Sequence, residues 1–250
     1  MKKILLTGLS LAMVFIMAGG ILAAETVTVV FDENVFPIQY IDENGKAAGL
    51  YPSLIKAVLE DISVKYELQA YPWKRAIYKM EKEGAGVGGM YWNEKRSKIY
   101  DYSKPMFTER LMLYVRKGEG FKFEKIEDLK GKTLGINLGW SYGTEFDSAL
   151  EKGLFTGEPV KGNELNFRKL SNKRVDAIID LEVAAAPMIK KLDMNDQVEK
   201  LPRPVTSIDT HIVFSKEFNK TDLLKKIDES MDKLRKNGTF DKIINEYLKP

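Results

Sequence analysis

The chain has 250 residues, 44% of them hydrophobic and 30% charged, and a formal net charge of +3. Two lysines and no acidic residue lie in its first 24 residues, which leaves +1 on the remainder, where both signs are interspersed without a basic block. Nucleic acid is therefore not an expected partner. The chain has no cysteine, which excludes disulfides, thiolate metal sites and a lipidated cysteine, and we expect no cofactor or metal.

Residues 1–24 have the pattern of a secretory signal peptide, with two lysines, an apolar run and small residues at its end. Cleavage is expected after Ala24, with Ala23 as the other candidate. The run is long enough to span a bilayer, so an uncleaved anchor is the alternative. An exported chain without a lipid anchor is expected in the periplasm.

The next part of the chain alternates strands and helices. β-branched residues predict a first strand, the pair Asn44-Gly45 predicts a hairpin turn, and apolar residues at helical spacing predict the helix that follows. A loop with Phe36 and Pro37 follows the first strand. In chain order we expect strand 26–31, helix 51–62, strand 66–71, helix 73–83, strand 84–90 and strand 111–116.

The stretch 71–105 has the composition of a ligand pocket. Aromatic rings and two arginines lie beside a glycine-rich run at 84–89, and together they offer stacking faces, forked donors and free peptide groups. A buried aromatic cluster with solvated arginines is the alternative. The glycines indicate either a close ligand or tight packing. The side chains concerned are Trp73, Arg75, Tyr91, Trp92 and Arg96.

A second strand-and-helix unit begins after the charged, glycine-containing segment 117–120. Its strand, 133–137, leads through a glycine-rich turn at 138–143 into a helix over 144–152. Such a turn presents free N–H groups and a positive helix end to a small anion, although its spacing is not that of a nucleotide-binding fingerprint. The turn contains Trp140 and Ser141.

The last part of the chain again mixes both kinds of element. Pro187 is expected in the first turn of a helix over 182–191, and Pro202 to Pro204 are expected to interrupt the regular structure. The lone histidine, His211, falls on a strand that returns to the first unit and is interpreted as structural. The remaining expected elements are helix 166–170, strand 175–180, strand 210–214, a helix from Thr221 that stops at Asn237-Gly238, and helix 240–248.

Six segments in order make the chain similar to the family 3 extracellular solute-binding proteins, receptors that deliver polar amino acids and similar solutes to ABC importers. Each is short, but together they cover nearly all of the chain after the leader. They are Gly49-Leu50-Tyr51, Trp73-Lys74-Arg75-Ala76, Glu94-Lys95-Arg96 followed by Tyr102-Ser103-Lys104-Pro105, Glu127 to Gly135, Val175 to Ile179, and Leu234 to Phe240.

The resemblance implies a two-lobed α/β fold, in which two crossing hinge strands join the lobes and the ligand lies between them. The first lobe is expected to comprise residues 25–116 and 210–250, and the second residues 117–209. It also implies a non-catalytic monomer that binds a small polar or anionic solute and presents it to a membrane permease.

Site residues carry over from the resemblance position by position. Arg96 matches the arginine that forks onto a ligand carboxylate, which suits guanidinium geometry. Stacking is expected from Trp73 and Phe36, polar contacts from Tyr91 and Gly89, and a cap over the carboxylate from Ser141, with Arg75, Trp140 and Asp180 as further candidates.

One departure from the family pattern bears on the ligand. The family commonly has an aspartate for a ligand α-amino group where this chain has Leu181, between Asp180 and Glu182. An ammonium without a counter-charge is costly to bury, so recognition of an α-amino acid becomes doubtful unless a flanking acid substitutes.

Two other functions remain open on the same fold. The resemblance extends to periplasmic cyclohexadienyl dehydratases, for which Glu94, Glu182 and the arginines are candidate groups. The sequence shows neither a nucleophile with an adjacent base nor an HExxH pair, and this argues against an enzyme. A soluble partner of a membrane sensor would have the same sequence features as a transport receptor.

Overall fold

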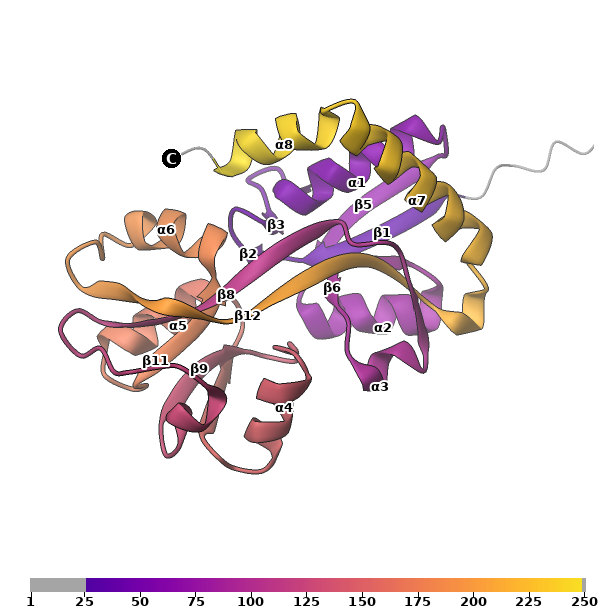
Figure 1. Cartoon of the computed structure of the whole chain (residues 1–250). Coiled ribbons are helices and arrows are strands. Elements are labelled where there is room, and N and C mark those ends of the chain that lie inside the picture. Colours follow the sequence, from indigo (N-terminus) through magenta and orange to yellow (C-terminus); the bar gives the residue numbers. More distant parts are fainter. Residues whose placement is uncertain (1–25, 249–250) are drawn as a thin grey trace, which may run out of the picture.

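Two long neighbouring strands, β8 (Phe107–Arg116) and β12 (Val198–Ser215), run through both lobes of the molecule. The computed structural model describes residues 26–248, so the expected signal peptide lies outside the described residues (Figure 1). Nine strands from both lobes form one twisted sheet in the order β10-β9-β11-β8-β12-β6-β1-β5, with β7 beside β12, and β2, β3 and β4 form a separate three-stranded sheet. The predicted two-lobed α/β fold with two crossing strands is confirmed.

The first lobe holds both ends of the described chain. Its β1, β5 and β6 are parallel neighbours, and β1 is rich in β-branched residues as expected of a buried strand. The elements are β1 (Val27–Asp32), β2 (Asn34–Val35), β3 (Gln39–Ile41), β4 (Ala47–Ala48), α1 (Leu50–Asp61), β5 (Tyr66–Tyr71), α2 (Trp73–Glu83), β6 (Gly86–Tyr91), α3 (Glu94–Ser97), β7 (Tyr100–Tyr102), η2 (Lys216–Phe218), α7 (Thr221–Lys236) and α8 (Thr239–Leu248).

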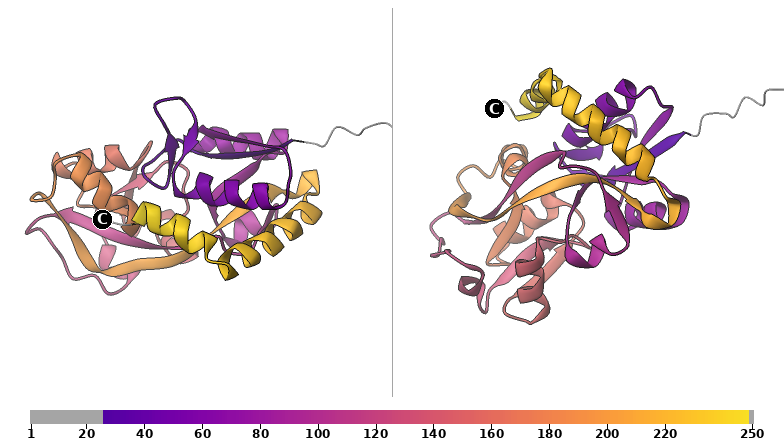
Figure 2. Two further views of the ribbon diagram at one scale, coloured as in Figure 1. Left: turned by 90° about the horizontal axis from the view of Figure 1, so that it is seen from above. Right: turned by 45° about the vertical axis from the view of Figure 1, so that its right-hand side comes forward.

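The two C-terminal helices cover the first lobe next to α1 (Figure 2). Helix α7 buries an apolar stripe that includes Leu224, Ile227 and Met231, spaced as an amphipathic helix requires. The helix ends as predicted, because Gly238 has a φ of +80°, which favours glycine.

The second lobe is formed by the middle of the chain. Its elements are η1 (Ile126–Leu129), β9 (Thr133–Asn137), α4 (Thr144–Glu151), β10 (Thr156–Val160), α5 (Asn163–Ser171), β11 (Ala177–Leu181) and α6 (Glu182–Lys191). Strand β11 pairs with Leu111 to Tyr114 of β8, so β8 belongs to both lobes. The residue ranges given above for the lobes stay a prediction.

Proline positions account for two differences from the sequence-based expectations. Strand β12 continues past Pro202 and Pro204, where its pairing with β8 shifts register but does not end. Pro187 lies in the interior of α6 and not in its first turn. Strand β10, which contains Pro159 and is mostly polar, was not expected from the sequence, and it lies at an edge of the sheet, where proline is tolerated.

The glycines of β6 are explained by packing. A Cβ on Gly86 would lie 2.7 Å from the Phe214 ring, and one on Gly88 would lie 2.4 Å from the Phe31 ring. Of the two readings of this run, tight packing therefore applies to both positions.

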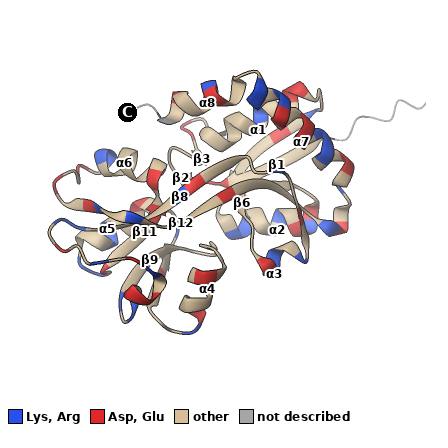
Figure 3. Cartoon of the chain, viewed as in Figure 1, with Lys and Arg blue, Asp and Glu red and all other residues tan. Residues whose placement is uncertain are grey.

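Lysine and arginine are interspersed with acidic residues over both lobes (Figure 3). Among residues 26–248, no helix combines the length and apolar character that a membrane crossing requires. No group of three or more His, Asp or Glu residues in the same range could hold a metal ion.

Candidate ligand-binding site

A small chamber lies where the two lobes meet. Ten residues line it: Gln39, Tyr51, Trp73, Gly89, Tyr91, Arg96 and Glu109 from the first lobe, and Trp140, Ser141 and Leu181 from the second. Its volume is about 10 Å³, enough for about one water molecule. Aromatic side chains fill most of the space, so a larger molecule can enter only when the lobes part or a ring moves.

Arg96 is positioned by a short helix. Asn93 caps α3, because its Oδ1 accepts a hydrogen bond from the backbone N–H of Arg96 at 2.8 Å. The guanidinium donates to the carbonyls of Tyr91 at 3.2 Å and of Gly139 at 3.4 Å, and the second contact crosses to the other lobe. Burial lowers the pKa of Arg96. No carboxylate of the described residues forms an ion pair with it, so the guanidinium keeps the capacity to bind an anion.

Two tryptophans form hydrogen bonds across the interface, one from each lobe. Trp73, at the start of α2, donates through Nε1 to the Gly139 carbonyl at 3.2 Å, and Trp140 donates to Asp32 Oδ2 at 3.2 Å. The Trp140 ring also makes an edge contact with Tyr91, with centroids 6.0 Å apart. Both tryptophans border a second cavity of about 210 Å³. They therefore separate two adjoining spaces of the interlobe cleft.

A buried carboxyl lies on the hinge strand β8. Tyr51 donates its hydroxyl to Oε1 of Glu109, and Tyr91 donates its hydroxyl to Oε2. Glu109 is 1% exposed. Burial, the largest cause, raises the pKa of Glu109 to about 7, while the two tyrosine hydrogen bonds lower it.

Two further buried carboxyls flank the cleft. Asp180 lies next to the end of β11 and accepts a hydrogen bond from Asn163 Nδ2 at 3.4 Å, and burial raises its pKa to about 7. Asp32 ends β1, and burial raises its pKa to about 6 despite the hydrogen bond from Trp140. The negative charge of Asp180 also raises the pKa of Glu109.

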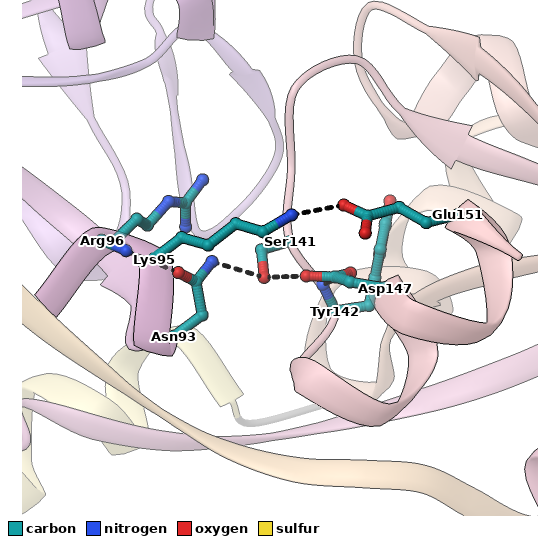
Figure 4. A network of polar contacts seen from close by, with 7 residues as sticks. All are labelled: Asn93, Lys95, Arg96, Ser141, Tyr142, Asp147 and Glu151. Atoms are coloured by element: carbon teal, nitrogen blue, oxygen red, sulfur yellow. Dashed lines mark hydrogen bonds and ion pairs between the residues drawn. The ribbon is translucent and has the colours of Figure 1, made fainter.

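Polar contacts fasten the lobes together beside Arg96 (Figure 4). Asn93 Nδ2 donates to Ser141 Oγ at 3.1 Å, and Ser141 in turn donates to Asp147. Nearby, Lys95 and Glu151 form an exposed ion pair at 2.6 Å. This structure is therefore a closed arrangement of the two lobes.

The structure brings six of the nine predicted site residues together. These are Trp73, Gly89, Tyr91, Arg96, Trp140 and Ser141. Gly89 has a φ of +82°, and a Cβ there would lie 2.5 Å from the Tyr51 ring. Both its conformation and its neighbour therefore require glycine at this position.

The other three predicted residues lie outside the chamber. Phe36 packs edge-on against Tyr40 and borders a separate groove of about 1180 Å³. Arg75 lies over the Tyr71 ring, 5.1 Å from its centroid, and borders the second cavity. Asp180 is buried and does not line the chamber.

Sequence reasoning did not select Gln39, Tyr51 or Glu109 as site residues. Glu109 is the most consequential, because it is the one carboxylate among the lining residues. Its sequence neighbours Thr108 and Arg110 are polar, which is typical of a solvent-facing strand end. The groups that accompany its burial are Tyr51 and Tyr91, which are 58 and 18 residues away in the sequence.

A two-lobed fold with a chamber at the lobe interface defines a ligand-binding protein of the clamshell type. The family model of the bacterial extracellular solute-binding proteins, family 3, matches residues 27–250. The chain belongs to that family.

Individual relatives are distant but cover most of the chain. The L-cystine-binding protein TcyJ of Escherichia coli (strain K12) is 22% identical over 217 residues, which are 85% of this chain and 78% of that protein. The arginine-binding extracellular protein ArtP of Bacillus subtilis (strain 168) is 25% identical over 219 residues, 85% and 82% of the two chains. A solved ancestral arginine-binding protein bound to arginine is 27% identical, with a TM-score of 0.76 over 90% of this chain and 98% of that one.

Proposed function

We propose that this protein is a periplasmic receptor that closes its two lobes around a small amino acid or related carboxylate and delivers it to an ABC import permease. Membership of the solute-binding family supports the receptor role. The carboxylate preference rests on Arg96, whose guanidinium lines the chamber with no acidic partner among the described residues. A closed clamshell that makes contacts from both lobes is the form that such a permease would recognise.

Arg96 is the observation that carries the proposal. Its two present contacts are to backbone carbonyls, which a ligand carboxylate can replace with stronger, charge-assisted hydrogen bonds. Trp73 and Trp140 supply aromatic faces on either side, and Ser141 supplies a hydroxyl from the second lobe.

A thermal-shift screen of the mature chain over the twenty L-amino acids and small carboxylates tests the proposal. A compound that binds only the folded chain raises its melting temperature. Arg96→Ala should lose that shift while retaining the far-ultraviolet circular dichroism spectrum of the wild type. A shift of unchanged size in the variant would remove Arg96 from the site, and the absence of any hit would contradict the receptor proposal.

The two glutamates that the sequence suggested for a dehydratase, Glu94 and Glu182, lie outside the chamber. Glu94 is exposed and pairs with Lys98, while Glu182 pairs with Arg110 and Lys200, and neither lines the chamber. Incubation with prephenate or arogenate, followed by product analysis, discriminates a dehydratase from a receptor. A soluble sensor partner would bind the same ligand, and gene neighbourhood separates it from a transport receptor.

A further inference from the structure

Glu109 is a buried carboxyl without a cationic partner. In the described part of the chain, no lysine, arginine or histidine forms an ion pair with it. Its neighbour Arg110 pairs instead with Glu182. A buried carboxylate is costly unless a charge or several hydrogen bonds compensate for lost hydration. Two hydroxyl donors give only part of that compensation.

The free side of Glu109 faces the chamber. A carboxylate offers about four lone-pair sites, and here each oxygen accepts one tyrosine hydroxyl. One site on each oxygen therefore remains available, and Glu109 is among the residues that line the space between the lobes. Tyr51 and Tyr91 hold the carboxyl in place from α1 and β6.

The other candidate acids are engaged elsewhere. Leu181 lines the chamber and offers no charge. Asp180 accepts hydrogen bonds from Asn163 and from the backbone N–H of Leu181, and Glu182 is ion-paired with two basic side chains. Among the residues that line the chamber, Glu109 alone can supply a negative charge.

We propose that Glu109 is the counter-charge for an ammonium or guanidinium group of the ligand. The inference rests on the proposed receptor function and narrows the ligand class to compounds that carry both a carboxylate and a cationic nitrogen. Glu109 is then the specificity-determining residue for the cation, as Arg96 is for the carboxylate.

Tyr91 contacts both Arg96 and Glu109. Its carbonyl accepts a hydrogen bond from Arg96, and its hydroxyl donates to Glu109. The guanidinium and the carboxyl therefore lie toward the backbone end and the hydroxyl end of one tyrosine. A cation at the far end of a ligand side chain fits this separation, as does an α-ammonium on a ligand that tilts toward Glu109, so the test distinguishes the two.

Four probes of the same carbon length carry the cation at different places. L-lysine has both amines, L-norleucine only the α-amine, 6-aminohexanoate only the terminal amine, and hexanoate neither. Titration calorimetry at pH 8 measures their affinities for the wild type and for Glu109→Gln, which keeps the shape of the side chain but removes its charge and replaces one acceptor oxygen with an NH2 donor. Any L-amino acid that the thermal-shift screen selects is measured in the same way beside its des-amino acid.

The cationic compound that binds best should lose about 30-fold or more in affinity in Glu109→Gln, because one member of a buried charge pair is neutralised. The affinity of its analogue without the cationic group should change little, so the preference for the cation collapses. A loss of affinity for 6-aminohexanoate would show that Glu109 binds the terminal amine, and a loss for L-norleucine would show that it binds the α-amine. Glu182→Gln makes the same chemical change outside the chamber and should leave both affinities unaltered.

Two results would overturn the inference while the receptor function stands. One is a cation preference that persists in Glu109→Gln, and the other is wild-type binding of hexanoate or a des-amino acid as tightly as its amine-bearing counterpart. If no amino acid or carboxylate binds the wild type, the receptor proposal fails and the role of Glu109 fails with it.

Discussion

Asn93 and Ser141 join the two lobes through a single amide. The Oδ1 atom of Asn93 caps the helix that bears Arg96, and its Nδ2 atom donates to Ser141 Oγ across the interface at 3.1 Å. The residue that positions the proposed carboxylate-binding arginine thus also contacts the opposite lobe. Closure and ligand contact are therefore coupled at this point.

Asn93→Asp should weaken ligand binding by about three- to tenfold. The substitution retains an acceptor for the Arg96 N–H but removes the donor to Ser141, and one such hydrogen bond contributes about 1 kcal/mol. It also places a second carboxylate near Asp147. Titration calorimetry measures the loss, and small-angle scattering should show a larger open fraction.

The control for this prediction is Lys95→Ala. The Lys95–Glu151 pair also crosses the interface, but both side chains are more than 60% exposed, and exposed pairs contribute little. An effect of Lys95→Ala as large as that of Asn93→Asp would mean that general charge, and not the amide bridge, holds the lobes closed.

Gly89→Ala should reduce the free energy of unfolding by about 2 kcal/mol or more. A left-handed conformation costs a non-glycine residue about 1 kcal/mol or more, and the added Cβ would also collide with the Tyr51 ring 2.5 Å away. Urea denaturation measures the change. Gly118→Ala is the matched control, because Gly118 has a φ of +79° with nothing within 4 Å of its Cβ position, and it should show the backbone cost alone.

Stability should fall as the pH rises from about 4 to 7. Burial raises the folded-state pKa of Glu109 to about 7, of Asp180 to about 7 and of Asp32 to about 6. The folded chain therefore binds these protons more tightly than the unfolded chain, so their stabilising contribution is present below the unfolded pKa values and is lost by about pH 7. For Glu109 alone the difference is on the order of 3 kcal/mol.

Comparison with Glu109→Gln isolates this one group. Tyr51, Tyr91 and Asp180 act on the Glu109 carboxyl and are unchanged in the variant. Urea midpoints at pH 5, 6, 7 and 8 should decline less steeply in Glu109→Gln than in the wild type. Parallel slopes for the two proteins would mean that Glu109 does not titrate in this range.

Trp140→Phe should raise the pKa of Asp32 further. The indole N–H donates to Asp32 Oδ2 at 3.2 Å and lowers that pKa, and phenylalanine has no donor. Carbon-13 NMR of the aspartate carboxyl follows the titration. Trp73→Phe removes a hydrogen bond to a carbonyl instead and should leave the Asp32 titration in place; equal shifts in both variants would contradict the specific contact.

Local patterns in the sequence were sufficient for most of the fold. Helix α2 was predicted over its full range, and in the structure Pro72 precedes it and Gly84, with a φ of +73°, ends it. Strand β12 was predicted too short, since Pro202 and Pro204 interrupt such patterns, yet the neighbouring β8 absorbs them through register shifts. The residues around Pro202 and Pro204 do not reveal that β12 pairs with the distant strand β8, so the full length of β12 could not be predicted from them.

The site residues also fall into two groups: those that short sequence motifs identify and those that depend on contacts between distant segments. Arg96 and Trp73 lie within short family motifs, so the sequence alone identified them as candidates that the structure brings to the chamber. Phe36 lies in a loop whose path depends on packing against Tyr40 and the second lobe. Glu109 was missed because its burial depends on two tyrosines from other elements.

The unequal division of the chamber wall has a kinetic consequence. Seven of its ten lining residues, including Arg96 and Glu109, belong to the first lobe or to its end of β8. A solute can thus form most of its contacts on that lobe while the molecule is still open. Substitutions there should mainly slow capture, whereas changes at Trp140, Ser141 or Leu181 should mainly shorten the residence time of the bound solute.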